Sequence, residues 1–234
     1  MTITFDHVEQ EAEHIATYYF APERLVQYTA GQFVELSLEH PHADNRGRRR
    51  WFTLSSSPTD ELVSITTKHT PKAGSSFKKA LQAMLPGDQI QMSDAMGDFV
   101  LPKLIQTPLI FVAGGIGITP FHSMLTWLHH TNEARNISLL YGVHSEEEII
   151  FQNTITSAGV HATIIVDQPA HAWGGQRGML TADSIIGLEP VNDDALIYVS
   201  GPEPMVEQLE QGLLHKGVKK HQLVLDFFPN YVTD

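Results

Sequence analysis

A glycine-rich segment, Gly114-Gly115-Ile116-Gly117-Ile118-Thr119-Pro120, separates an apolar run at Leu109–Ala113 from an amphipathic stretch that begins at Phe121. The run is typical of a buried strand and the stretch after it of a helix. Glycines at such a turn let the backbone approach a ligand closely, and a proline in the first helical turn exposes the amides of the loop. The segment therefore predicts a dinucleotide-binding turn that is neither a P-loop nor a full GxGxxG fingerprint. The alternative is a turn whose glycines serve only close packing of strand and helix.

The same alternation continues to the end of the chain. Apolar strands are expected at Leu109–Ala113, Ile137–Tyr141, Ala162–Val166 and Ala195–Ser200, and helices at Phe121–His130, Glu146–Ser157 and Pro204–Lys216. Continuous apolar strands separated by helices indicate a parallel sheet that is covered on both faces. Residues 104–234 are therefore predicted to form a doubly wound α/β domain.

The first hundred residues have a different pattern of apolar and polar residues. Alternating segments at Thr2–Phe5, Phe33–Leu38 and Leu62–Thr67 predict short strands, with turn signals between them. One helix is expected over Ser75–Leu85, with Ser75 or Ser76 as its N-cap and Phe77, Leu81 and Leu85 on one face. The sequence thus predicts an antiparallel β-barrel over residues 1–103.

Composition excludes several classes of protein. A net charge of −12 argues against nucleic-acid or anionic-membrane partners, and no apolar run is long enough to span a bilayer. The chain has no cysteine, so it can hold neither a disulfide nor a Cys-ligated metal or iron–sulfur centre, and its 13 histidines lack the spacing of metal ligands. No metal is expected. The polar N-terminus is not a signal peptide, and the expected location is the cytoplasm.

A second chemical segment follows a basic run and reads Arg50-Trp51-Phe52-Thr53-Leu54-Ser55. Alternation along a strand places Arg50 and Phe52 on one side. A guanidinium suits a pyrophosphate, and an aromatic wall with neighbouring hydroxyls suits a flavin ring. The alternative is an ordinary half-buried strand behind a basic loop.

Three further turns fit a nucleotide site. Gly74-Ser75-Ser76 opens the predicted helix and is a candidate anion site, although both serines can also act simply as caps. Two later strands end in small residues, where ligands of parallel sheets collect. These ends contain Gly142 and the segment Gly201-Pro202-Glu203-Pro204-Met205.

In this order the motifs resemble those of the ferredoxin–NADP reductase superfamily, in its compact form without an iron–sulfur domain. The resemblance covers nearly the whole chain. It includes Arg50-x-Phe52-Thr53, the segment Gly74–Ser76, the turn Gly97-x-Phe99, the loop Gly114–Pro120 and Gly201-Pro202-x-Pro204-Met205.

The resemblance implies a role for each matching residue. Arg50 would hold the FAD pyrophosphate, Phe52 would pack against the isoalloxazine, and Thr53 would lie near flavin N5. Thr119 would lie near the point of hydride transfer, and Phe228, or else Tyr231, would cover the other flavin face. Thr53, Thr119 and Phe228 are therefore the expected catalytic residues. The remaining residues expected to bind FAD or the nicotinamide dinucleotide are Trp51, Leu54, Ser55, Thr67, Lys68, Gly74, Ser75, Ser76, Gly114, Gly115, Ile116, Gly117, Pro120, Gly142, Gly201, Pro202 and Met205.

The segment after the second parallel strand bears on the choice between NADH and NADPH. Family members that use NADPH tend to carry a basic residue there, whereas this chain has Glu146-Glu147-Glu148. Three carboxylates would repel a 2′-phosphate, which favours NADH, although Arg177 remains a cation that could reach the phosphate.

The predicted function is hydride transfer from NADH or NADPH to FAD, followed by electron transfer to a protein or small-molecule acceptor that the residues do not identify. One alternative is an electron-transfer subunit of a larger complex. Another is a flavin- or dinucleotide-binding module without turnover. An α/β-hydrolase is excluded because the chain has no Gly-x-Ser-x-Gly elbow.

Overall fold

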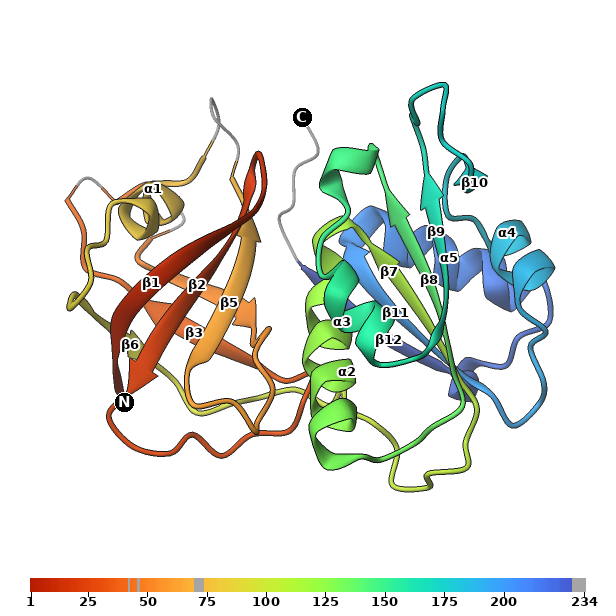
Figure 1. Ribbon diagram of the computed structural model, residues 1–234, viewed down its shortest axis with the longest axis horizontal. Helices are drawn as coiled ribbons and strands as arrows, with labels where there is room; N and C mark the ends of the chain where they lie inside the picture. Colours follow the sequence, from red (N-terminus) through yellow and green to blue (C-terminus); the bar gives the residue numbers. More distant parts are fainter. Residues whose placement is uncertain (42, 46, 70–73, 229–234) are drawn as a thin grey trace.

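The computed structural model describes residues 1–41, 43–45, 47–69 and 74–228, which form two domains side by side (Figure 1). The first is an antiparallel barrel and the second a parallel sheet with helices on both faces. This architecture confirms the predicted fold. Among the described residues, no helix is both long and apolar enough to cross a membrane.

The barrel is a six-stranded antiparallel sheet. Its strand order is β4-β3-β6-β1-β2-β5, and a bridge between Leu54 and Ile65 joins the two edges. The strands are β1 (Thr2–Ala12), β2 (Ile15–Pro22), β3 (Phe33–Ser37), β4 (Arg49–Thr53), β5 (Val63–Lys68) and β6 (Gln89–Met92).

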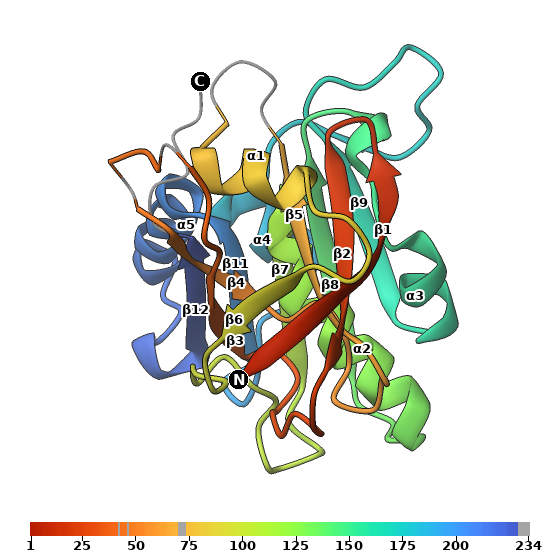
Figure 2. The same ribbon diagram turned by 90° about the vertical axis from the view of Figure 1, so that its left-hand side faces the viewer.

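Helix α1 (Ser76–Gln82) lies across one end of the barrel (Figure 2). Phe77 and Leu81 are fully buried against the barrel core, as the periodicity predicts. The predicted end at Leu85 is wrong: the helix stops at Gln82, and Leu85 is exposed. Leu85 is kept out of the helix by Pro86, which disfavours helical backbone at the residue before it, and the Leu85 N–H instead donates to Asp88 Oδ2.

The second domain is a six-stranded parallel sheet. Its order, β10-β9-β8-β7-β11-β12, places the direction change beside β7, where open parallel sheets bind ligands. The strands are β7 (Leu109–Gly114), β8 (Ile137–Val143), β9 (His161–Val166), β10 (Gln176–Arg177), β11 (Leu196–Pro202) and β12 (Leu223–Phe228).

Alternate residues of the strands serve two apolar clusters, one on each face of the sheet. Phe111 belongs to the cluster under α2 and α3, whereas Val112 belongs to the cluster under α4 and α5. The helical elements are η1 (Gly115–Ile118), α2 (Thr119–Thr131), η2 (Glu146–Glu148), α3 (Gln152–Ser157), α4 (Ala182–Leu188), α5 (Glu203–His215) and η3 (Lys220–Gln222).

The single helix predicted over Glu146–Ser157 is wrong, because the segment divides into η2 and α3. Phe151 has left-handed backbone at φ 59°, which interrupts helical hydrogen bonding. Its ring stacks on His122 of α2 with centroids 3.7 Å apart. The break therefore accompanies a tertiary contact that no local pattern records.

Polar bonds join α2 to the barrel segment between β4 and β5. The Ser123 hydroxyl donates to the carbonyl of Ser56, and the Thr59 hydroxyl is 2.7 Å from His130 Nδ1. The predicted boundary at 103/104 stays a prediction, and it lies in the coil between β6 and β7.

Candidate functional site

The register of the parallel sheet brings the predicted glycine-containing strand ends together. Gly114 of β7 pairs with Gly142 of β8, and on the other side of β7 strand β11 runs on to Gly201 and Pro202. Pro202 in turn pairs with Phe228 of β12. These residues therefore share the carboxyl edge of the sheet.

The glycines of the loop have two different roles. A Cβ atom on Gly114 would lie 2.2 Å from Met205 Sδ, and one on Gly117 would lie 2.2 Å from the carbonyl oxygen of Ser200. Both glycines thus allow the loop to pack against β11 and α5. Gly115 is different, because its φ is +51° and a Cβ there would meet nothing within 4 Å. Its backbone presents an open face to a ligand.

The residues around Gly115 are largely enclosed. Ile116, Thr119 and Pro120 are buried. The Thr119 hydroxyl donates to the carbonyl of Ile116 at 3.1 Å, which fixes the turn between η1 and α2. The role of Thr119 in hydride transfer stays a prediction.

Arg50 on β4 is held in place by contacts on several sides. Its Nη1 donates to the carbonyls of Gly47 and Arg49, and its Nη2 lies 3.3 Å from Asp44 Oδ1. The guanidinium also lies 5.5 Å from the ring centroid of Phe77. A fixed guanidinium of this kind is suited to binding a phosphate.

The two aromatic residues after Arg50 lie on opposite faces of β4. Phe52 is buried in the barrel core, with its ring 5.8 Å from that of Phe77. Trp51 is 59% exposed and has Phe33 as a ring neighbour. Trp51 is thus the exposed aromatic residue of this strand, and the packing of Phe52 against a flavin stays a prediction.

The next predicted residues, Thr53, Leu54, Ser55 and Thr67, are all buried in the barrel. Ser55 Oγ accepts a hydrogen bond from Thr66 and lies 3.1 Å from Ser64 Oγ. Side chains so enclosed hold the strands, and contacts of these residues with a cofactor stay predictions.

Lys68 at the end of β5 reaches the second domain. Its Nζ lies 2.6 Å from Glu148 Oε1 in η2, and its own carbonyl accepts a hydrogen bond from Lys78 of α1. The ion pair with Lys68 of the barrel thus neutralises the charge of Glu148, one of the three glutamates at 146–148.

The other two glutamates of this run, Glu146 and Glu147, have different environments. Glu146 accepts a hydrogen bond from the backbone N–H of Ala170, whereas Glu147 is fully exposed, and a hydrogen bond from Ser145 lowers its pKa. Arg177 Nη2 donates to the carbonyls of Ala170, His171 and Trp173, so this cation is engaged in holding its own loop.

The residues at the start of α1 form hydrogen bonds within the chain, and their binding of an anion stays a prediction. Ser75 is the N-cap, and its Oγ accepts the N–H of Lys78. The Ser76 N–H donates to Asp44 Oδ2 at 2.8 Å, and Ser76 Oγ accepts the N–H of Asp44 at 2.9 Å. Asp44 was not among the predicted residues, since a lone aspartate in a polar loop gives no sequence signal.

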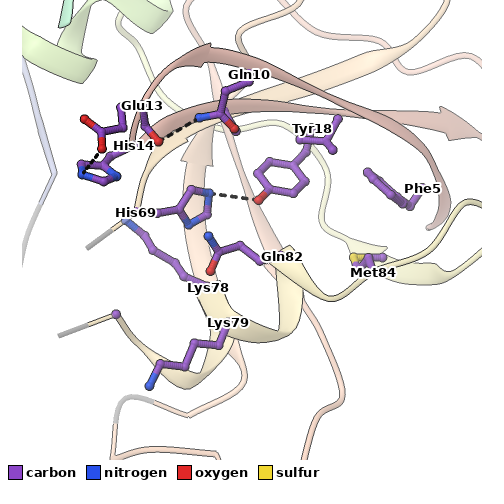
Figure 3. A pocket seen from close by; sticks show the side chains of 13 residues that line it. Phe5, Gln10, Glu13, His14, Tyr18, His69, Lys78, Lys79, Gln82 and Met84 are labelled. Atoms are coloured by element: carbon purple, nitrogen blue, oxygen red, sulfur yellow. Dashed lines mark hydrogen bonds and ion pairs between the residues drawn. The ribbon is translucent and has the colours of Figure 1, made fainter. Parts of the chain in front are cut away.

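A cavity of about 410 Å³ lies between the β1–β2 hairpin and α1, with Gly74 and Lys78 in its wall. Figure 3 shows the 2.9 Å hydrogen bond between Tyr18 and His69, with Gln82 of α1 nearby. His69 Nδ1 is buried and has no hydrogen-bond partner among the described residues, and burial lowers the pKa of this imidazole to about 4.

Asp226 is a second residue that sequence reasoning missed. It lies on β12 beside Ser200 of β11, whose hydroxyl donates to Asp226 Oδ2 at 3.2 Å. Burial raises the pKa of the Asp226 carboxyl from 3.8 to about 6, although the Ser200 hydrogen bond acts in the opposite direction. The only sequence signal was its place in the predicted C-terminal strand.

The other predicted residues at this edge are Pro202, Met205 and the C-terminal aromatics. Met205 packs against Gly114 and Gly201. Phe228 ends β12, beside Pro202, and Tyr231 lies outside the described residues. The assignment of either aromatic to a flavin face stays a prediction.

Comparison with known sequences agrees with this geometry. Residues 111–211 match the oxidoreductase NAD-binding domain family. A flavohemoprotein of Xylella fastidiosa (strain Temecula1 / ATCC 700964) is 27% identical over 226 residues, which cover 93% of this chain and 56% of that protein. NADH oxidoreductase HCR of Escherichia coli is 25% identical over 215 residues, covering 92% and 64% respectively. The chain thus spans less than two thirds of these relatives.

Solved structures share the whole fold. The FAD/NAD-binding domain of nitric oxide dioxygenase from Vibrio cholerae superimposes with a TM-score of 0.83 at 19% identity, covering 97% of this chain and 98% of that one. A ferredoxin NADP+ reductase from Neisseria gonorrhoeae, with bound FAD and NADP, has a TM-score of 0.82 at 18% identity and the same coverage. These structures have the two-domain fold that the motifs of this chain predicted.

Proposed function

We propose that this chain is an FAD-dependent oxidoreductase that accepts a hydride from a reduced nicotinamide dinucleotide and passes electrons to a separate acceptor. The observation that carries the proposal is the open backbone at Gly115, on the sheet edge that also presents Gly142 and Gly201. Strand β5 of the barrel contacts η1, so this loop lies against the domain that carries Arg50. Flavin and nicotinamide chemistry in the named relatives supports the same function.

The residues of the barrel fit an FAD molecule. Arg50 offers a fixed cation for the pyrophosphate, on the side of β4 that also carries Phe52. When bound, FAD supplies the redox chemistry, and the chain supplies placement. Phe52 supports the strand from inside the barrel.

NADH is the proposed donor. Glu147 is exposed at the end of β8, where a carboxylate would repel a 2′-phosphate. Arg177, the cation considered from the sequence, holds three carbonyls of its own loop. This side of the site therefore favours a dinucleotide without the additional phosphate.

The proposed acceptor is a redox protein or domain. Two relatives are described as a flavohemoprotein and as the reductase subunit of a glycine betaine monooxygenase, and this chain covers 56% and 59% of their lengths. The chain has no cysteine, so a Cys-ligated cluster that relays electrons would belong to a partner.

The test is to mix the FAD-loaded protein anaerobically with NADH and, separately, with NADPH. The flavin absorption at about 450 nm is followed in both cases. We expect rapid bleaching, and faster bleaching with NADH. Gly115→Ala should slow bleaching without releasing FAD, because it adds a methyl group to the open face of the loop. Gly187→Ala on α4, where a Cβ also meets nothing, is the matched control. Failure of both nucleotides to bleach bound flavin would contradict the proposal.

A further inference from the structure

We propose that Asp44 is a built-in competitor for the FAD pyrophosphate. Its carboxylate pairs with Arg50, the cation on which a flavin dinucleotide depends, so FAD binds by sharing or exchanging this partner. The inference rests on the proposed function, because it concerns the cofactor assigned there.

Two contacts place the Asp44 carboxylate. Oδ1 lies 3.3 Å from Arg50 Nη2, and Oδ2 accepts the backbone N–H of Ser76 at 2.8 Å. Both donors are of the kind that binds a phosphate oxygen, and both bind the carboxylate through charge-assisted hydrogen bonds. Asp44 thus links β4 to the start of α1 through an anion that belongs to the chain itself.

Arg50 cannot turn freely to a second partner. Its side chain is 17% exposed, its Nη1 donates to Gly47 and Arg49, and its guanidinium lies over Phe77. Since the cation is held, an incoming pyrophosphate must come to it and meets the negative charge of Asp44 there. Like charges at one guanidinium repel each other, and the repulsion is strong where water is partly excluded.

Ser76 Oγ is bound by two residues that precede β4. The Asp44 N–H donates to Ser76 Oγ, and His40 Nε2 lies 2.9 Å from the same oxygen. Asparagine at position 44 retains a carbonyl oxygen for the Ser76 N–H while removing the charge. The substitution therefore isolates electrostatic competition from the shape of the loop.

Glu39 offers a matched control. Its side chain lines the same cavity as Asp44, about 850 Å³ in volume and bounded by α1, but it pairs with Arg48. Glu39→Gln removes one negative charge from the same surface without releasing Arg50. Asp44→Glu is the second control, since it keeps the charge.

The experiment measures FAD dissociation constants by flavin fluorescence, using the full chain freed of flavin. Asp44→Asn should bind FAD at least about tenfold more tightly than the unmodified chain, which corresponds to about 1.4 kcal/mol. Glu39→Gln and Asp44→Glu should remain within about threefold of it. Riboflavin, which has no phosphate, should bind all four proteins equally.

The outcomes separate the two proposals. Equal or weaker FAD binding by Asp44→Asn, with its circular dichroism unchanged, would overturn the competition. A tenfold gain that riboflavin shares would also overturn it, because the effect would not depend on phosphate. Absence of FAD binding in all four proteins would instead overturn the proposed function.

Discussion

Replacing Asp226 by asparagine should remove a pH-dependent loss of stability from the protein. Burial raises the pKa of this carboxyl from 3.8 to about 6, so the folded state binds the proton more tightly than the unfolded chain does. The resulting stabilisation is complete below pH 3.8 and is lost as the pH rises through about 6.

The magnitude follows from these two pKa values. The difference between about 6 and 3.8 corresponds to about 3 kcal/mol, at about 1.36 kcal/mol for each pH unit. Only part of this free energy is lost between pH 5 and pH 8, because the carboxyl of the unfolded chain is already mostly ionised at pH 5. Between pH 5 and pH 8 the Asp226 carboxyl should remove about 1.4 kcal/mol from the free energy of unfolding.

Urea denaturation followed by circular dichroism at both pH values measures this difference. From pH 5 to pH 8 the unmodified protein should lose about 1.4 kcal/mol more than Asp226→Asn. Asp193→Asn, an exposed aspartate that pairs with Lys219, is the control and should follow the unmodified protein. Identical pH dependence of Asp226→Asn and the unmodified protein would refute the reasoning.

Three further predictions concern the glycine loop and its surroundings. Gly117→Ala should lower the free energy of unfolding by about 1–3 kcal/mol, because its Cβ would lie 2.2 Å from a backbone oxygen, whereas Gly115→Ala should cost about 1 kcal/mol; thermal denaturation giving the reverse order would contradict this. A double-mutant cycle with Lys68→Met and Glu148→Gln should give a coupling of less than about 1 kcal/mol. That coupling should fade in 1 M salt, roughly a 3 Å screening length, and a salt-independent value would argue against an ion pair. Glu147→Arg should raise kcat/KM for NADPH about tenfold relative to NADH, and an unchanged ratio would exclude Glu147 as the discriminating residue.

Hydrophobic periodicity was enough to predict both domains, because each core depends mainly on the spacing of apolar residues along its strands. The glycine loop was also found at its predicted place between β7 and α2. Its sequence could not show that Gly114 and Gly117 face neighbouring atoms while Gly115 is open. That distinction depends on β11 and Met205, which are distant in the chain.

The features that sequence reasoning missed all depend on long-range contacts. The break at Phe151 accompanies stacking on His122 from another helix. The raised pKa of Asp226 comes from its burial on β12, which pairs with β11. Strand alternation correctly placed Trp51 and Phe52 on opposite faces, but it could not tell which face the barrel would enclose.

Helix α2 has a consequence for the reaction as a whole. The helix starts at Thr119, directly after the glycine loop, and further along it Ser123 and His130 meet the barrel segment that follows β4. A single helix therefore links the glycine loop of the second domain to the barrel. In the proposed reaction, the spacing between nicotinamide and flavin therefore depends on how α2 packs against the barrel.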